Sequence, residues 1–328
     1  MQHSPHHVDP HCQQCLTSKI KPYFQDLTPR DIDTMPERLT DASETMEYYQ
    51  RPDKERSTLH FGQLKLWISE VKLLARFTRA CEGVAYTVVY AGAAPGHHIP
   101  HLASLFPTCT FELYDPVDFC PSLKTRTPKN VKIYHRTYFT DQTVNKYQGI
   151  QNLVFISDIR TGTEESYVEI DMLNQQKWVK RLQPEVSMLK FRLPWTPGQT
   201  PYLGGIILLP AFAPTTSTEM RLICTRNDIL TPKLYDNTWY ERVCAFHNTV
   251  GRARMYQRVM NIQVEGLDRC HDCSMLVSVV TEYLFRNGTQ ITPNNIKTMI
   301  DNLIASLELN RTIKTAHTVS STHKKYRR

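Results

Sequence analysis

The chain has 328 residues, of which 41% are apolar, and a formal net charge of +7. That length and composition suffice for one large core or two small ones. No run of about 18 apolar residues occurs and the N-terminal segment MQHSPHHVDPHCQQC has no apolar stretch, so we expect neither a membrane span nor a secretory leader. The basic balance favours a polyanionic partner, although the basic tail alone can be a solubilising end.

Polar, His- and Pro-rich residues up to about position 45 are expected to form an extension. Beyond them, apolar periodicity predicts helices at 61–80, 98–106, 140–148, 165–182, 239–250 and 294–309. Apolar runs predict strands at 85–91, 110–114, 131–135, 152–157, 186–193, 205–209 and 219–225. Because strands and helices alternate, we expect an α/β fold with a mainly parallel sheet.

A glycine turn, YAGAAPGHH, follows the first predicted strand. Gly92 and Gly96 bracket the turn and Pro95 stiffens it, and glycine lets a backbone approach a ligand closely. Asp115 ends the next strand, about twenty residues on, where an acid can hold both ribose hydroxyls of an adenosine cofactor. An ordinary turn followed by a surface aspartate is the alternative. The turn lacks a full GxGxxG, which favours S-adenosylmethionine over a dinucleotide.

Two acids and two lysines stand at positions where chemistry is expected. Asp158 ends the strand NLVFISD, and ligands of open α/β sheets lie at the carboxyl ends of strands; the alternative is a helix N-cap. Lys190 faces away from the apolar side of its strand, which also suits a solvated face. Glu219 is followed by Arg221 on the same face, so a plain ion pair is its alternative. Lys65 belongs to a polar helix stripe, which is often only solvated.

Taken in order, GQLKL, YAGAAPGHH, the strand ending at Asp115, ISDIR, MLKFRLPW and PAFAPTTSTEMRL resemble the poxvirus cap-specific mRNA 2′-O-methyltransferases. That family also serves as the small subunit of the viral poly(A) polymerase. The resemblance covers about residues 61–250, and the glycine turn is also similar to that of ribosomal RNA 2′-O-methyltransferases. It implies a class I S-adenosylmethionine-dependent fold, Rossmann-like, with a mostly parallel central sheet flanked by helices.

The resemblance also implies site residues. The family's catalytic tetrad falls on Lys65, Asp158, Lys190 and Glu219. Its cofactor contacts fall on Gln63, Tyr90, Gly92, Ala94, Pro95, Gly96, His97, Asp115, Tyr138 and Asp158. One departure is Val117, where the family has an arginine two residues after the ribose-binding acid, so part of the adenosine contact must differ.

Methylating a ribose hydroxyl requires that the oxygen be placed in line with the methyl group and lose its proton. A lysine accepts a proton only when neutral, and its ordinary pKa is about 10.4, so the site must favour the neutral amine. The hypothesis is that Lys190 is the general base, that Asp158, Lys65 and Glu219 orient it, and that no metal takes part.

The family stacks the cationic 7-methylguanine between two aromatic rings and binds its edge with acids. The corresponding residues here are Tyr49, Arg192, Leu193, Pro194, Trp195, Ser217, Thr218, Glu219 and Glu241. Tyr48 is an alternative to Tyr49 as the second stacking ring, and a core position is the alternative for Trp195. Two departures, Thr216 in place of an aromatic residue and Pro197 in place of an acid, make cap binding less secure than methyl transfer.

Two C-x-x-C pairs, Cys12 with Cys15 and Cys270 with Cys273, can be combined into a tetrahedral zinc site. Their separation of more than two hundred residues is unlike a compact zinc finger. Free thiols are therefore the favoured interpretation.

The expected organisation is an extension at 1–45, a methyltransferase core at 46–255, a helical segment at 256–310 packed on the core, and a basic, disordered tail at 311–328. We expect capped mRNA as substrate, S-adenosylmethionine as cofactor, and a poly(A) polymerase catalytic subunit as an additional partner. Two alternatives stay open: a non-catalytic RNA-binding subunit of that polymerase, and a 2′-O-methyltransferase of uncapped RNA. The cysteines and the viral resemblance indicate a host-cytoplasmic location, with packaging in the virion as an option.

Overall fold

The computed structural model describes residues 39–48, 59–162, 164–213, 216–248, 264 and 271–307. The basic tail and most of the N-terminal extension lie outside them. Within these ranges, no helix is both long enough and apolar enough to cross a membrane.

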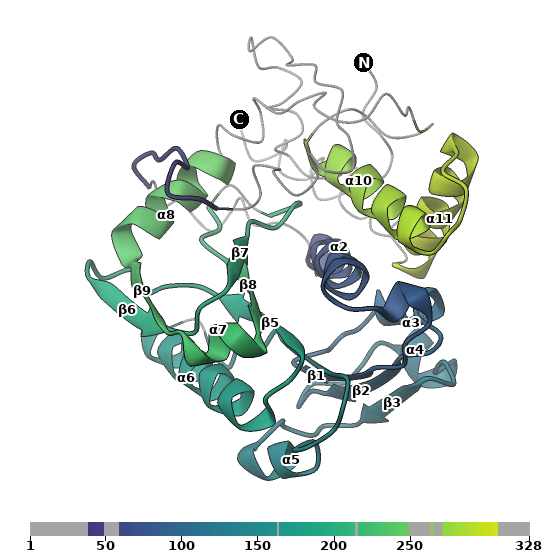
Figure 1. Ribbon diagram of the computed structural model, residues 1–328, viewed down its shortest axis with the longest axis horizontal. Helices are drawn as coiled ribbons and strands as arrows, with labels where there is room; N and C mark the ends of the chain where they lie inside the picture. Colours follow the sequence, from purple (N-terminus) through teal and green to yellow (C-terminus); the bar gives the residue numbers. More distant parts are fainter. Residues whose placement is uncertain are drawn as a thin grey trace, which may run out of the picture.

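A seven-stranded sheet forms the centre of the fold, in the order β3-β2-β1-β4-β5-β8-β7 (Figure 1). The five strands β3, β2, β1, β4 and β5 are parallel, whereas β8 runs antiparallel to both β5 and β7. The strands are β1 (Thr87–Ala91), β2 (Thr110–Tyr114), β3 (Val131–Tyr134), β4 (Leu153–Ser157), β5 (Val186–Phe191), β7 (Ile206–Leu208) and β8 (Met220–Thr225). The expected α/β fold with a mostly parallel sheet is confirmed.

The order of the strands reverses at β1 and β4. From β1 the chain proceeds outward through β2 and β3, then returns to add β4 and β5 on the other side of β1. In open α/β sheets, ligands bind at the carboxyl ends of the strands beside such a reversal. The segments that follow β1, β2 and β4 contain the glycine turn, Asp115 and Asp158, so the fold gathers them at this edge.

Helices cover both faces of the sheet (Figure 1). Alternate strand residues divide between two cores: Val88 and Tyr90 pack with α2, α3, α10 and α11, whereas Val89 and Ala91 pack with α6 and α8. The larger helices are α2 (Leu59–Phe77), α3 (Ile99–Leu105), α6 (Glu165–Leu182), α8 (Asn237–Phe246), α10 (His271–Arg286) and α11 (Pro293–Ser306). Short elements are η3 (Ala80–Glu82), α4 (Pro121–Thr125), α5 (Asp141–Asn145), α7 (Arg226–Leu230), and a two-stranded sheet of β6 (Gln199–Tyr202) and β9 (Lys233–Asp236).

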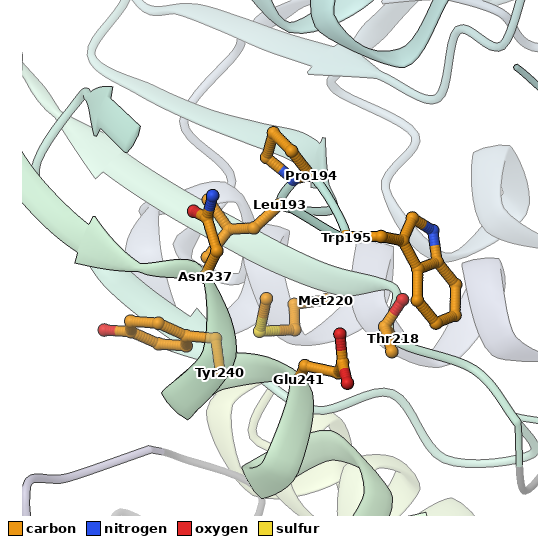
Figure 2. Close-up of a pocket in the computed structure, with 8 residues that line it drawn as sticks. All are labelled: Leu193, Pro194, Trp195, Thr218, Met220, Asn237, Tyr240 and Glu241. Atoms are coloured by element: carbon orange, nitrogen blue, oxygen red, sulfur yellow. The ribbon is translucent and has the colours of Figure 1, made fainter. Parts of the chain in front are cut away.

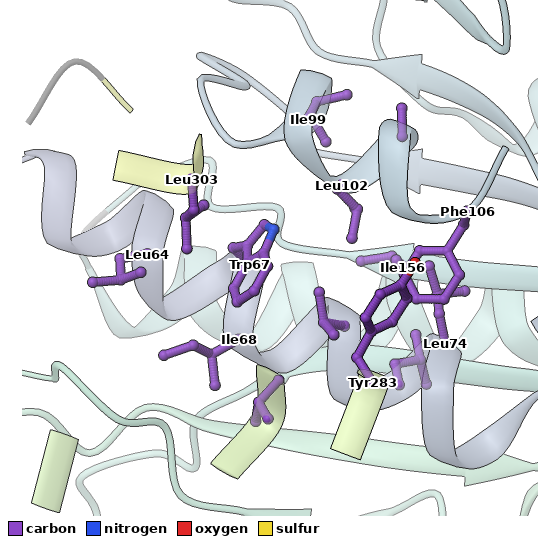
Figure 3. Packing of buried hydrophobic residues seen from close by; sticks show 14 of the residues in the cluster. Leu64, Trp67, Ile68, Leu74, Ile99, Leu102, Phe106, Ile156, Tyr283 and Leu303 are labelled. Atoms are coloured by element: carbon purple, nitrogen blue, oxygen red, sulfur yellow. The ribbon is translucent and has the colours of Figure 1, made fainter. Parts of the chain in front are cut away.

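Helix α2 is buried on nearly every side, because α10 and α3 pack against it. Figure 3 shows Leu64, Trp67 and Ile68 of α2 in the same apolar cluster as Leu303 of α11. The polar stripe of α2 is therefore not a solvated face: Ser69 and Lys72 are buried. Arg76 of this stripe forms an ion pair with Glu282 of α10, at 2.6 Å between Nη2 and Oε2.

The structure contains elements that the periodicity did not predict. These are η3, α4, α7 and the β6–β9 pair, whereas α10 lies within the segment 256–310 that was expected to be helical but had no predicted bounds there. Predicted ends were generally correct to within a few residues, and α6 matches its predicted range of 165–182. The predicted helix at 140–148 is reduced to α5, which ends at Asn145.

Candidate functional site

Lys65, Asp158, Lys190 and Glu219 meet at the carboxyl edge of the sheet. Asp158 directly follows β4, Lys190 lies near the end of β5, Glu219 directly precedes β8, and α2 carries Lys65. The Lys65 Nζ atom is 2.5 Å from Glu219 Oε1. The Lys190 Nζ atom lies between the two acids, 3.3 Å from Asp158 Oδ1 and 3.4 Å from Glu219 Oε2.

Arg221 is a fifth charged member of this cluster. It is the cross-strand partner of Lys190, and its side chain is 1% exposed. Its guanidinium lies 2.8 Å from Asp158 Oδ1 and 3.0 Å from Glu219 Oε1. Sequence reasoning treated Arg221 only as a neighbour of Glu219. The available signal was that residues two apart on a strand share a face, so Arg221 had to lie beside both Glu219 and Lys190.

The cluster contains three cations and two carboxylates. Burial lowers the pKa of Lys65, and Arg221 and Lys190 lower it further against the opposing effect of Glu219. Burial alone would raise the pKa of Glu219, but Lys190, Lys65 and Arg221 outweigh burial and hold it well below its ordinary value. Glu219 is therefore ionised, and the surroundings of Lys65 disfavour the charged form of its amine.

Two of the alternative interpretations do not fit the geometry. Asp158 caps no helix, since α6 begins at Glu165 with Glu164 as its N-cap. Lys190 is not on a solvated face, because its side chain is only 13% exposed and touches both acids. Glu219 does pair with Arg221, as its alternative required, but it also contacts both lysines.

The glycine turn and Asp115 contact each other directly. Asp115 Oδ2 accepts a hydrogen bond from the Ala94 N–H at 2.9 Å, and Oδ1 accepts one from the Val117 N–H at 2.8 Å. Burial raises the pKa of Asp115, and the nearby charge of Asp158 raises it further. Each carboxylate oxygen still has a lone pair for another donor. The acid is thus fixed in direction and able to accept hydroxyl groups.

The backbone geometry of the turn requires glycine at position 92. Its φ is +80°, and a Cβ atom there would lie 2.8 Å from the Asp158 carbonyl carbon and the Ile159 nitrogen. Glycine thus lets the turn after β1 pass against the end of β4. Gly96 also has a positive φ, of +72°.

The remaining expected cofactor contacts surround this turn. Gln63 and Tyr90 are buried beneath it, and Gln63 Oε1 accepts the His97 N–H at 2.9 Å. Val117 and Tyr138 are unusually exposed for apolar side chains, at 64% and 63%. The Val117 backbone N–H donates a hydrogen bond to the Asp115 carboxylate. The backbone N–H of Thr137, the residue before Tyr138, donates to the Asp115 carbonyl. Two exposed apolar groups thus flank a fixed carboxylate.

Beyond the charged cluster lies a small hollow that is open to solvent (Figure 2). Trp195 and Glu241 are at its rim, and Trp195 is partly exposed instead of being a core residue. Burial raises the pKa of Glu241. The full lining is Leu193, Pro194, Trp195, Thr218, Met220, Asn237, Tyr240 and Glu241. Five of these are among the expected cap-binding residues.

Trp195 is held by contacts on several sides. The Arg192 guanidinium lies 5.0 Å from its ring centre, and Glu165 pairs with Arg192 while accepting the Trp195 N–H at 3.1 Å. Tyr48 meets the Trp195 ring edge-on, with ring centres 4.6 Å apart. Its hydroxyl donates to the Thr216 carbonyl at 3.1 Å. Tyr49 lies outside the described residues, so the aromatic partner seen here is Tyr48. Ser217 lies in the adjacent loop, where its Oγ accepts the Glu219 N–H.

The zinc alternative gains no support. Cys12, Cys15 and Cys270 lie outside the described residues, and Cys273 is buried in α10. Where the structure describes the chain, no group of three or more metal-binding side chains comes together.

Comparison with known proteins identifies relatives in poxviruses. A fowlpox virus cap-specific mRNA (nucleoside-2′-O-)-methyltransferase is 34% identical over 179 residues, covering 49% of this chain and 57% of that protein. The enzyme of the same name from myxoma virus (strain Lausanne) is 30% identical over 222 residues, covering 60% of this chain and 63% of that protein. The chain therefore matches less than two thirds of each relative's length. The solved structure of bluetongue virus VP4, described as a multifunctional RNA-capping production line, superposes with a TM-score of 0.45 at 12% identity, covering 75% of this chain and 38% of VP4.

The family model described as poly A polymerase regulatory subunit matches residues 37–307. This range includes the whole sheet, all the helices named above, the charged cluster and the hollow. The chain belongs to the poly A polymerase regulatory subunit family.

Proposed function

We propose that the protein transfers a methyl group from S-adenosylmethionine to the 2′-hydroxyl of the first transcribed nucleotide of 7-methylguanosine-capped mRNA. The observation that carries this proposal is the meeting of two lysines and two acids at the sheet edge, next to the glycine turn and Asp115. The names of the poxvirus relatives support the same activity.

The edge of β1 and β2 suits an adenosine cofactor. Asp115 accepts both ribose hydroxyls, because its oxygens are fixed by two backbone N–H groups and retain free lone pairs. We infer that the adenosine lies against the exposed side chain of Val117 and the backbone at Tyr138. Gln63, Tyr90 and the turn from Gly92 to His97 enclose the remainder. S-adenosylmethionine supplies, when bound, a methyl group activated by a positively charged sulfur.

The lysines and acids then act on the ribose. Lys190 binds the 2′-hydroxyl and accepts its proton while the oxygen forms its bond to the methyl carbon; the bond from that carbon to sulfur breaks, and S-adenosylhomocysteine would be the leaving group. Asp158 and Glu219 hold the Lys190 amine between them, and Lys65 and Arg221 balance their charges. A bound sulfonium would add a further positive charge beside these three cations and two carboxylates.

The hollow beside the cluster suits the cap. Trp195 offers a flat ring for stacking on the cationic 7-methylguanine, and Glu241 offers an acceptor for its polar edge. Tyr48 and Trp195 touch edge-on, with no room for a base between them. A two-sided sandwich therefore requires Tyr48 to move from Trp195. Arg192, Pro194, Ser217 and Thr218 are proposed to contact the capped nucleotide around this stack.

A second role is as a processivity subunit for a poly(A) polymerase. The family model, whose description names that assembly, favours this role. Both roles are compatible, because methyl transfer uses the carboxyl edge of the sheet and leaves other surfaces of the protein available for a partner.

The product identifies the reaction. Capped RNA is incubated with S-adenosylmethionine, digested to nucleosides, and analysed by mass spectrometry. We expect one added methyl group on the ribose of the first transcribed nucleotide. The proposal would be refuted if the added methyl group were on a base, or if the RNA gained no methyl group after incubation with the wild-type protein. Tail-length assays with a poxvirus-type polymerase catalytic subunit test the second role, and Lys190→Ala should leave that role intact.

A further inference from the structure

A buried polar network lies beneath the glycine turn and consists of Gln63, Glu70, Tyr90 and His98. Helix α2 supplies Gln63 and Glu70, β1 supplies Tyr90, and His98 is the N-cap of α3. Glu70, Tyr90 and His98 are 0% exposed and Gln63 is 4% exposed. None of the network belongs to the charged cluster, and only Gln63 and Tyr90 are expected to touch the cofactor.

The hydrogen positions in this network follow from its geometry. Gln63 Oε1 accepts the His97 backbone N–H at 2.9 Å, so the atom at this position is the amide oxygen. His98 Nδ1 lies 2.9 Å from the same oxygen and must therefore carry a hydrogen. His98 Nε2 faces the Glu70 carboxylate at 2.9 Å, and the Tyr90 hydroxyl donates to Glu70 at 2.8 Å.

Burying a carboxylate and an imidazole away from water is unfavourable unless both are paired. An apolar pair would fill this space without that cost. The network instead fixes the Gln63 amide from two directions, one backbone N–H and one imidazole N–H. Gln63 is two residues before Lys65 on α2, so the same contacts tie the lysine-bearing helix to the turn.

We propose that His98 is a positioning residue: its Nδ1–H orients Gln63 toward the cofactor, and Glu70 holds the imidazole in the required orientation. This inference rests on the proposed function. The two ring nitrogens have separable roles, because Nδ1 contacts Gln63 directly, whereas Nε2 contacts the Glu70 carboxylate, which anchors the ring.

Two substitutions separate these roles. In His98→Asn, the amide nitrogen can replace Nδ1 and keep the bond to Gln63, but Glu70 loses a partner. In His98→Gln, the amide nitrogen can replace Nε2 and keep Glu70 paired, but Gln63 loses its second donor. Affinity for S-adenosylmethionine and S-adenosylhomocysteine is measured by calorimetry, and stability by urea unfolding.

We expect a crossed result. His98→Asn should bind the cofactor within about threefold of wild type although it is the less stable variant, while His98→Gln should bind about tenfold more weakly, as for one lost hydrogen bond. Glu282→Gln, which removes another buried carboxylate bound to α2, is the matched control and should leave affinity unchanged. If cofactor affinity simply follows stability across the three variants, the positioning role of His98 is overturned, while the cofactor assignment stands. A wild-type protein that binds neither compound would overturn the cofactor assignment as well.

Discussion

Lys190 of β5 and Arg221 of β8 are direct cross-strand partners, and both direct their positive groups at Asp158 and Glu219. Arg221 is fully buried, whereas Lys190 remains 13% exposed. A guanidinium stays charged under all ordinary conditions. Arg221 therefore keeps a permanent positive charge beside both acids, and in the proposed reaction this lets Lys190 exchange a proton with substrate.

Replacing Arg221 with methionine should damage both stability and activity. Two partly buried carboxylates would lose one partner each, which costs up to about 3–5 kcal/mol of unfolding free energy. We expect roughly a hundredfold loss of kcat/KM, the scale of removing one preorganised charged partner. Arg221→Lys keeps the charge but lacks the forked geometry of the guanidinium. Its stability and activity should therefore lie between those of the wild type and Arg221→Met. Urea unfolding and initial rates check both effects, and an active Arg221→Met variant would contradict this role.

Cofactor affinity should depend on pH through Asp115. Burial raises the pKa of this carboxyl, so it takes up a proton at a higher pH than the ordinary value of about 3.9. A protonated Asp115 loses acceptors for the ribose hydroxyls, so affinity should fall as the pH is lowered. Asp115→Asn should bind roughly tenfold or more weakly at neutral pH and should lack this dependence. Calorimetry at a series of pH values tests it, and identical profiles would exclude Asp115 as the ribose ligand.

Trp195→Ala should weaken binding of capped RNA selectively. Stacking of one base on an aromatic side chain contributes about 1–3 kcal/mol, so the Kd for capped RNA, measured by direct binding, should rise roughly 5- to 150-fold. The Kd for uncapped RNA, measured in the same way, should stay the same. Tyr167→Ala, at an exposed aromatic residue of α6, is the control and should change neither value. If Trp195→Ala affects both RNAs equally, the hollow lined by Trp195 is not the binding site of the cap.

His101 should make the fold sensitive to mild acid. Burial lowers its pKa to about 4, whereas the unfolded chain has the ordinary value of about 6.5. Between these values the unfolded state binds the proton first, so the unfolding free energy falls as the pH drops, by on the order of 3 kcal/mol. In His101→Leu this contribution should disappear, while His135→Gln at an exposed histidine should keep it. Urea unfolding at pH 7, 5.5 and 4 would contradict this if all three proteins lost equal stability.

The sequence was sufficient to predict most of the sheet and the edge at which the charged residues meet. Apolar runs marked β1 and β4, and the rule on carboxyl strand ends grouped Asp158 with the glycine turn. Lys65 depended on the family resemblance, because a polar stripe on a helix does not reveal that another helix covers it.

The missing pieces have physical reasons. Helix α10 is buried from His271 to Leu284, and polar residues such as Ser278 and Glu282 are among its buried positions, so apolar spacing alone did not mark its bounds. Because α10 packs against α2, the polar stripe of α2 is buried instead of exposed to solvent. The contact of Tyr48 with Trp195 joins segments far apart in the chain, and no local pattern encodes it.

The central claim is that Lys190 drives methyl transfer to capped RNA, and one assay tests it most directly. Transfer from radiolabelled S-adenosylmethionine is measured on matched short RNAs, with and without a 7-methylguanosine cap, using wild type and Lys190→Ala. We predict transfer to the capped RNA only, lost in the variant while cofactor affinity is retained. Equal transfer to both RNAs would contradict cap specificity, and full activity in Lys190→Ala would contradict the assignment of the base.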